Sequence, residues 1–117
     1  MTIECEIAAH AGMVVDEIKN TLGEKWDSLS DTHKSAAQHA ARRIITLEWD
    51  KRNGVDVDDD FEFVMATVNG FKLVGEIALY DAFLEGLKKA LEAFGSFLVG
   101  VGKGLLPGLG GILNGSK

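Results

Sequence analysis

Apolar residues recur every three or four positions along most of this sequence, and that spacing limits its fold more than any other feature. Such residues line up on one face of an α-helix, which turns once in about 3.6 residues, and that face is buried against a neighbouring helix. We therefore predict an all-α fold of three amphipathic helices over residues 2–27, 30–52 and 57–94, packed as an extended helical hairpin or a bundle. Gly23 is expected to weaken the first helix by about 1 kcal/mol without ending it.

Residues that cap helices separate the first two stretches and end the second. The segment 27–31 is rich in Ser and Asp, whose side chains accept hydrogen bonds from the free N–H groups of a helix start. Ser28 or Ser30 is therefore expected to cap the second helix. Asn53 and Gly54 follow its basic end, and glycine readily takes the left-handed conformation that closes a helix.

The third stretch follows an acidic run and contains one competing signal. Acidic side chains suit the positive end of a helix dipole, so a helix start between Asp56 and Asp58 is expected. Asn69 and Gly70, however, are the pair most typical of a two-residue β-hairpin turn. Apolar and polar residues alternate poorly on both sides of the pair, which favours a helix. A kink or a hairpin at this pair, within residues 61–80, stays an alternative.

Glycine is distributed unevenly along the chain. There are 14 glycines and 1 proline, and eight of the glycines fall in residues 95–117. Residues 94–113 form a segment of 20 residues, which is the length of a membrane span, and carry a single charge, Lys103. Ordinary membrane spans contain more Leu, Ile and Val than this segment does. We expect a helical body, 1–94, and a glycine-rich apolar tail, 95–117, used in assembly or membrane contact. Whether 95–113 is helical is left open.

The apolar residues of the last predicted helix and of the tail are the candidate contact residues. An apolar surface of this size without a polar cover tends to associate with another chain or with a bilayer. The predicted assembly or membrane contacts are Phe83, Leu87, Leu91, Phe94, Phe97, Leu98, Val101, Leu105, Leu106, Leu109, Ile112 and Leu113.

The balance of charge argues against a nucleic-acid partner. Eighteen acidic and 12 basic side chains give a formal net charge of −6, which repels a phosphate backbone unless the basic residues gather on one surface. The densest basic stretch is interleaved with acids, as on a salt-bridged helix face: Arg42, Arg43, Glu48, Asp50, Lys51 and Arg52. The N-terminus is acidic where a secretory signal is basic, so synthesis and folding in a cytoplasm are expected.

No pattern of catalytic or cofactor-binding residues stands out. Asp56, Asp58 and Asp60 alternate as at the start of a calcium loop, but Phe61 replaces the required glycine and Thr67 replaces the bidentate glutamate. We expect no enzyme activity, no cofactor and no metal.

The three histidines and the single cysteine are expected to be packing or solvated residues. His33 and His39 are six positions apart and fall on different faces of a helix, and His10 is distant in sequence. Cys5 has no second cysteine in the chain for a disulfide or a zinc site.

With the helices placed, residues 24–100 resemble small helical proteins encoded among the structural genes of tailed bacteriophages and prophages. The shared elements are a start with Trp26 and Leu29, an alanine-rich helix, a turn with Gly54 and Asp56, and a long helix that ends in a Gly-, Phe- and Leu-rich tail. The resemblance implies a role in the virion or in its assembly, and it includes no catalytic residue.

Three classes of function remain. We expect a bacteriophage structural protein of the tail or head–tail region, present in the virion and made in the host cytoplasm, because three amphipathic helices are too few to cover one another. It would form a homo-oligomer or join other virion proteins through its helices and tail. The alternative is a membrane-active protein, ejected from the virion, holin-like or pore-forming, that inserts residues 83–113 into a bilayer. A third class is an adaptor whose second and third helices bind a helical partner.

Overall fold

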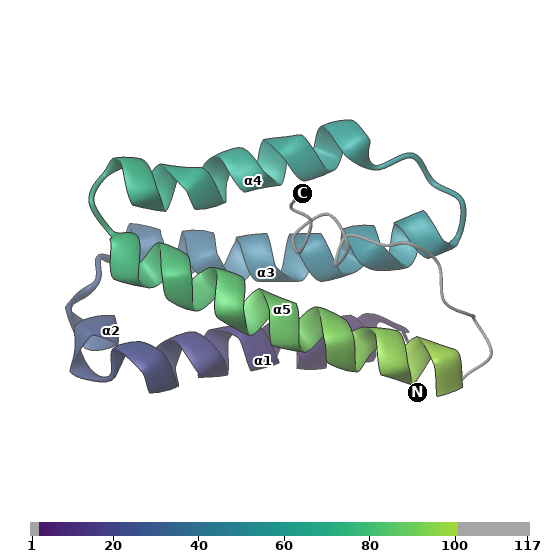
Figure 1. Cartoon of the computed structure of the whole chain (residues 1–117), viewed down its shortest axis with the longest axis horizontal. Helices are drawn as coiled ribbons and strands as arrows, with labels where there is room; N and C mark the ends of the chain where they lie inside the picture. The colour runs from purple at the N-terminus through teal and green to yellow at the C-terminus, as the bar shows by residue number, and fades with distance from the viewer. Residues whose placement is uncertain (1–2, 101–117) are drawn as a thin grey trace.

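The computed structural model describes residues 3–100, which form five α-helices and no strand. Four are long, α1 (Ile3–Leu22), α3 (Asp31–Arg52), α4 (Asp58–Leu73) and α5 (Ile77–Gly100), and α2 (Glu24–Ser28) is short. The long helices run alternately up and down (Figure 1). α1 and α4 each pack on both α3 and α5, so the four close into a bundle. The predicted all-α class is confirmed, although the number of helices differs.

The core lies along the axis of the bundle, where each long helix contributes one buried face. Burial of an aliphatic or aromatic side chain contributes about 1.5–3 kcal/mol relative to its exposure. The core includes the buried residues Val14, Ile18, Ile44, Leu47, Val68, Phe71, Phe83, Leu87 and Phe94. The stripe that the sequence spacing defines is therefore the stripe that the fold buries.

The first helix is shorter than the predicted 2–27. α1 ends at Leu22 because Gly23 has a φ of +58°, a left-handed conformation that glycine adopts without a steric penalty. The chain resumes as α2, where Trp26 is buried as part of the core. The expectation that Gly23 only weakens a continuous helix is wrong.

The second predicted helix has the expected limits at both ends. The Ser30 hydroxyl accepts a hydrogen bond of 3.1 Å from the backbone N–H of His33, so Ser30 caps α3. At the other end Asn53 is the C-cap, and Gly54 follows with a φ of +88°. α3 therefore starts and stops where local side-chain chemistry predicts.

The acidic run starts α4 as predicted. The Asp56 carboxylate accepts a hydrogen bond of 3.2 Å from the backbone N–H of Asp58, the first residue of the helix. Asn69 and Gly70 lie inside α4, so the hairpin alternative is wrong.

The helix predicted over 57–94 is nevertheless two helices. Gly75, with a φ of +88°, donates its backbone N–H to the carbonyl of Lys72, and the N–H of Glu76 donates to the carbonyl of Phe71. This pair of hydrogen bonds is the Schellman motif, which ends a helix at a glycine. The reversal makes α4 and α5 antiparallel neighbours. The bundle therefore has a fourth long helix, which covers apolar faces that three helices would leave exposed.

The boundary predicted at residue 94 falls inside a helix. α5 continues to Gly100, and Leu98 on its last turns is a buried core residue. Residues 101–117, most of the predicted tail, lie outside the described residues.

Candidate interaction surface

The α5 residues predicted as assembly or membrane contacts lie in the bundle core. Phe97 is half-buried against the core, and five others are buried: Phe83, Leu87, Leu91, Phe94 and Leu98. The remaining six predicted contacts lie outside the described residues: Val101, Leu105, Leu106, Leu109, Ile112 and Leu113. Contact of the five buried side chains with a bilayer or another chain requires α5 to leave the bundle, and their role in such contact stays a prediction.

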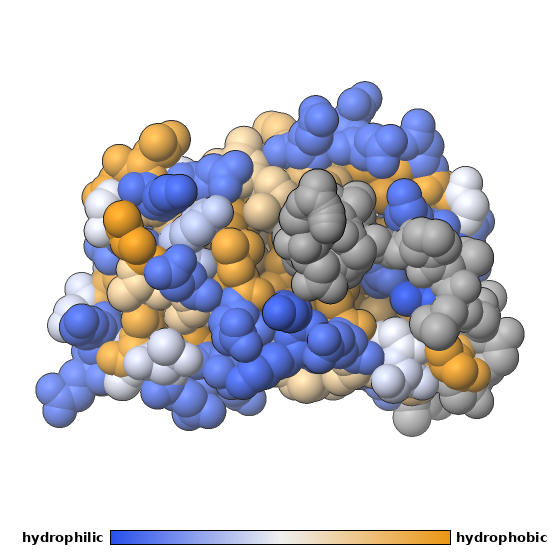
Figure 2. All heavy atoms as spheres, viewed as in Figure 1, coloured by the Kyte–Doolittle hydropathy of each residue, from blue (hydrophilic) through white to orange (hydrophobic). Residues whose placement is uncertain are grey.

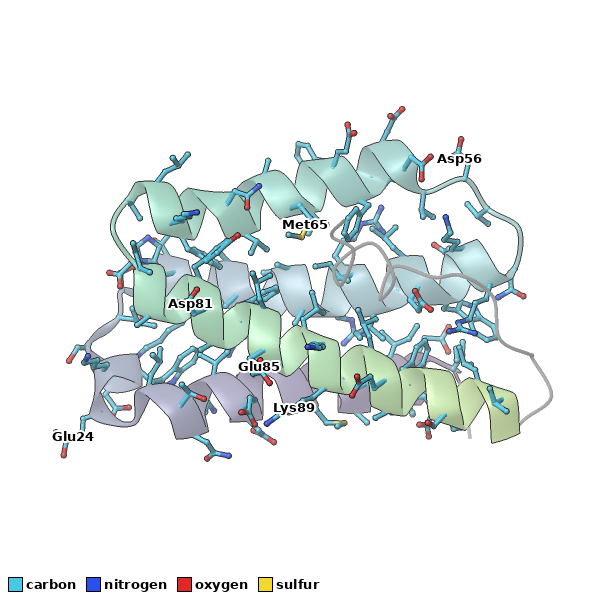
Figure 3. The ribbon with its side chains drawn as sticks, in the orientation of Figure 1. Glu24, Asp56, Met65, Asp81, Glu85 and Lys89 are labelled. Carbon is cyan, nitrogen blue, oxygen red and sulfur yellow. The ribbon has the colours of Figure 1, made fainter. Side chains whose placement is uncertain are left out.

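α5 lies close against α1 at one glycine. A Cβ atom added to Gly86 would be 3.0 Å from the carbonyl oxygen of Val14 and 3.1 Å from Cβ of Glu17, so a larger residue does not fit without movement of α1. Next to this contact Lys89 points toward α1 (Figure 3), and its Nζ lies 3.0 Å from the Glu17 carboxylate. That hydrogen bond and the negative charge of Glu17 raise the pKa of Lys89.

Two of the three histidines pack on phenylalanines. The His10 ring lies edge-on to Phe94 at 5.1 Å between ring centres, and the His33 ring lies edge-on to Phe71 at 6.0 Å. His39 is exposed on α3. Within residues 3–100, no group of three His, Cys, Asp or Glu side chains is placed to hold a metal ion.

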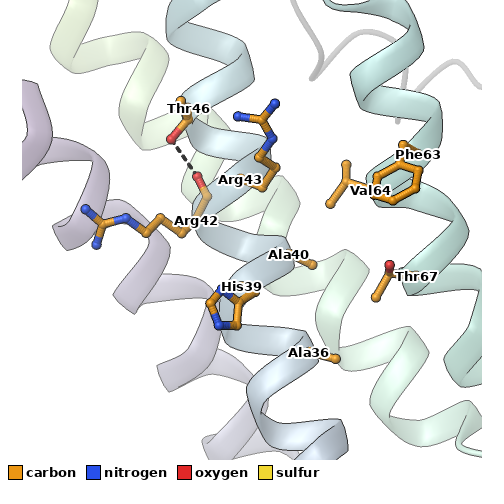
Figure 4. Close-up of a pocket in the computed structure, with 9 residues that line it drawn as sticks. All are labelled: Ala36, His39, Ala40, Arg42, Arg43, Thr46, Phe63, Val64 and Thr67. Atoms are coloured by element: carbon orange, nitrogen blue, oxygen red, sulfur yellow. Dashed lines mark hydrogen bonds between the residues drawn. The ribbon is translucent and has the colours of Figure 1, made fainter.

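A groove of about 450 Å³ runs between α3 and α4, with α5 behind it (Figure 4). Its α3 wall includes Ala36, Ala40 and Arg43, and its α4 wall is formed by Phe63, Val64 and Thr67. The side chains of the two alanines end at Cβ, so they leave open space above the α3 side of the groove. Phe63 is 79 % exposed, whereas the other five phenylalanines are buried or half-buried.

Charged side chains surround this groove. Arg42 is exposed on α3 and borders both this groove and a second, smaller one of about 310 Å³ between α1 and α3. Arg43 lies 3.6 Å from the Asp60 carboxylate on α4, and both side chains are about half exposed. Arg42 and the exposed Asp59 of α4 make no ion pair within the described part of the chain. The groove therefore has an apolar centre with Arg42 on its border, and Asp59 lies one helical turn before Phe63 on α4.

A second apolar surface lies at the turn between α4 and α5. This turn carries the exposed apolar residues Leu73, Val74 and Ile77. Apolar side chains gather at this end of the molecule in the surface view (Figure 2). We call these three residues the apolar tip.

Comparison with known proteins supplies no relative. No protein-family model matches the chain, and no curated protein or solved structure matches it. Of the helices within residues 3–100, none is both long and apolar enough to cross a membrane.

The exposure of Phe63 was not predicted from the sequence. Phe61, Val64 and Val68 share the buried stripe of α4, and Phe63 lies off that stripe although it stands between two of them. An aromatic residue off the buried stripe of an amphipathic helix indicates an exposed apolar site. That signal was present in the sequence once the phase of the helix was known.

Proposed function

We propose that this chain is a non-enzymatic assembly protein of tailed-bacteriophage particles. Its helical body associates with copies of itself, and its C-terminal segment joins those copies or other virion proteins. The observation that carries the proposal is an apolar sequence that continues after the end of α5. Leu98 is a buried residue near the end of α5, and residues 101–113 contain six more large apolar residues and one charge, Lys103. An apolar segment of this kind favours association, because its exposure to water is unfavourable.

The resemblance of residues 24–100 to small helical proteins among phage structural genes supports the virion setting. An up-and-down helical bundle with a groove on one face is also a common shape for a subunit that binds through helix surfaces. The exposed Phe63 beside this groove is a surface residue of the kind that such a subunit uses.

The mass of the full chain in solution tests the role of the C-terminal segment. We expect the wild-type chain to be an oligomer in light scattering, and the double substitution Leu105→Asp and Leu106→Asp to lower its mass. The matched control is Asn114→Asp with Ser116→Asp, which adds the same charge to the same segment and removes no large apolar side chain. A wild type that is monomeric at every concentration contradicts the proposal.

The virion setting has its own test. Mass spectrometry of purified particles from the phage or prophage that encodes the chain should detect it at a fixed copy number per particle. Its presence in lysed cells and absence from purified particles contradicts a virion role.

Membrane activity is the second candidate, and the length of the apolar sequence favours it. Residues 94–113 number 20 and carry one charge, close to the length of a membrane span. Insertion of residues 83–113 has to break the packing of α5 on α1, because Phe83, Leu87 and Phe94 are core residues.

Flotation with phosphatidylcholine vesicles separates the two candidates. A membrane-active chain floats as wild type, and the Leu105→Asp, Leu106→Asp variant stays at the bottom of the gradient. A wild type that does not float, with or without anionic lipid in the vesicles, removes the membrane candidate.

A further inference from the structure

We infer that the groove between α3 and α4 is the docking site for a second copy of this chain, with Phe63 of each copy seated in the groove of the other. The inference rests on the proposed self-association and identifies the surface of the helical body that performs it. Three observations support it: the exposure of Phe63, the shape of the groove, and the charges beside it.

Phe63 is the side chain in this region whose exposure is least favourable. It is 79 % exposed on the middle of a regular helix, so the exposure does not come from a chain end or a loop. Buried aromatic side chains dominate the binding energy of many protein interfaces, in particular where they fill a pocket near the centre. A partner that covers Phe63 therefore removes the largest exposed aromatic surface of the bundle.

The groove beside Phe63 has the shape that such a side chain needs. Ala36 and Ala40 lie one turn apart on α3, and their short side chains let another helix approach closely. Val64 and Thr67 complete the opposite wall (Figure 4). Because Phe63 stands at the edge of the same groove, a two-fold pair buries both aromatic rings and both grooves at once. This is the self-complementary contact that two-fold symmetry requires.

The charges beside the groove identify a second copy of the body, and not the C-terminal segment, as the occupant. Asp59 lies four residues before Phe63 on the same face of α4, and Arg42 borders the groove on α3. When Phe63 of one copy enters the groove of the other, Asp59 approaches Arg42 of the second copy, and the two opposite charges pair. Residues 101–117 contain two lysines and no acidic residue, so they offer no partner for Arg42, whereas a second copy offers Asp59.

The substitution Phe63→Gln in the full chain tests the inference by sedimentation equilibrium. Glutamine favours helix and has a similar length, so α4 keeps its structure while the groove loses its apolar partner. We expect the dissociation constant for self-association to rise at least about tenfold, as for the loss of a central aromatic anchor. The matched control is Leu73→Gln on the same helix, which removes an even more exposed side chain at the apolar tip and leaves self-association unchanged.

The orientation of the two copies is tested by exchange of charges. Arg42→Glu and Asp59→Arg should each weaken self-association about two- to fivefold, because exposed ion pairs contribute little. The double variant should return to the wild-type value, since the exchanged charges attract again. Additive weakening in the double variant overturns the Arg42–Asp59 pairing. Circular dichroism and thermal unfolding of each variant show whether the bundle is intact.

The outcomes separate this inference from the proposed function. If the wild type self-associates and Phe63→Gln has no effect, the docking site is overturned and the assembly role still stands. If Leu73→Gln weakens self-association more than Phe63→Gln does, the interface lies at the apolar tip and the docking site is also overturned. A wild type that stays monomeric at the highest concentration it reaches contradicts both.

Discussion

Gly86 and Gly70 occupy similar helical positions, yet they differ in what surrounds them. A Cβ on Gly86 would meet the backbone of α1 at Val14, whereas nothing lies within 4 Å of a Cβ on Gly70. Glycine in a helix interior is less favourable than alanine by about 0.5–1 kcal/mol. At Gly86 the close packing of α1 on α5 offsets the lower helix propensity of glycine, because a larger residue would prevent so close an approach.

This difference predicts opposite effects of one substitution. Gly86→Leu should lower the free energy of unfolding by about 1–3 kcal/mol, because the added side chain has to displace the α1 backbone. Gly70→Leu should leave the free energy unchanged or raise it by about 0.5–1 kcal/mol through helix propensity. Denaturation in urea, followed by circular dichroism, measures both. Equal stability of the two variants would contradict the close contact at Gly86.

At the scale of the helices, the decisive position is the break between α4 and α5. The sequence signal for a turn was strongest at Asn69 and Gly70, and the turn is at Gly75. The apolar spacing runs through Phe71, Gly75 and Leu79 without a visible interruption, so the periodicity conceals the break. A Schellman motif needs one residue in the left-handed conformation, and the spacing of apolar residues along a helix does not report the backbone conformation of a glycine.

The break predicts a specific sensitivity to a side chain at Gly75. Gly75→Ala should lower the free energy of unfolding by about 1–2 kcal/mol, because alanine is strained at a φ of +88°. Gly70→Ala, at a helical position on α4, should instead raise it by about 0.4–1 kcal/mol. Guanidinium denaturation of the two variants and the wild type measures the difference. A stabilising Gly75→Ala would show that α4 and α5 do not separate there.

At the scale of the whole molecule, four long helices bury one another's apolar faces within residues 3–100. Closure of the bundle gives Phe83, Leu87 and Phe94 a place in the core, although their spacing alone is equally compatible with contact with a partner. An apolar stripe is the same in both cases, because the hydrophobic effect does not distinguish a neighbouring helix of the same chain from another molecule. The groove between α3 and α4 likewise exists only after both helices are in place.

The bundle predicts where the chain can be shortened. A chain that ends at Gly100 should still fold, because it contains all five helices of the described residues. A chain that ends at Phe94 loses the buried Leu98 and should be less stable by about 1.5–3 kcal/mol. Thermal unfolding of the three chains provides the comparison. Equal midpoints for the chains ending at 94 and 100 would place the boundary of the body at 94 after all.

The sequence by itself determined the all-α class, the limits of α3, the start of α4 and the stripes that become the core. These features depend on contacts within a few residues, such as the Ser30 cap and the glycine after Asn53, or on spacing along one helix. Only the tertiary structure decided that Gly75 and not Gly70 reverses the chain, that the α5 stripe faces α1, and that Phe63 stands exposed beside a groove. Each of these depends on how one helix is positioned against another, and that relation is set by packing between residues far apart in the sequence.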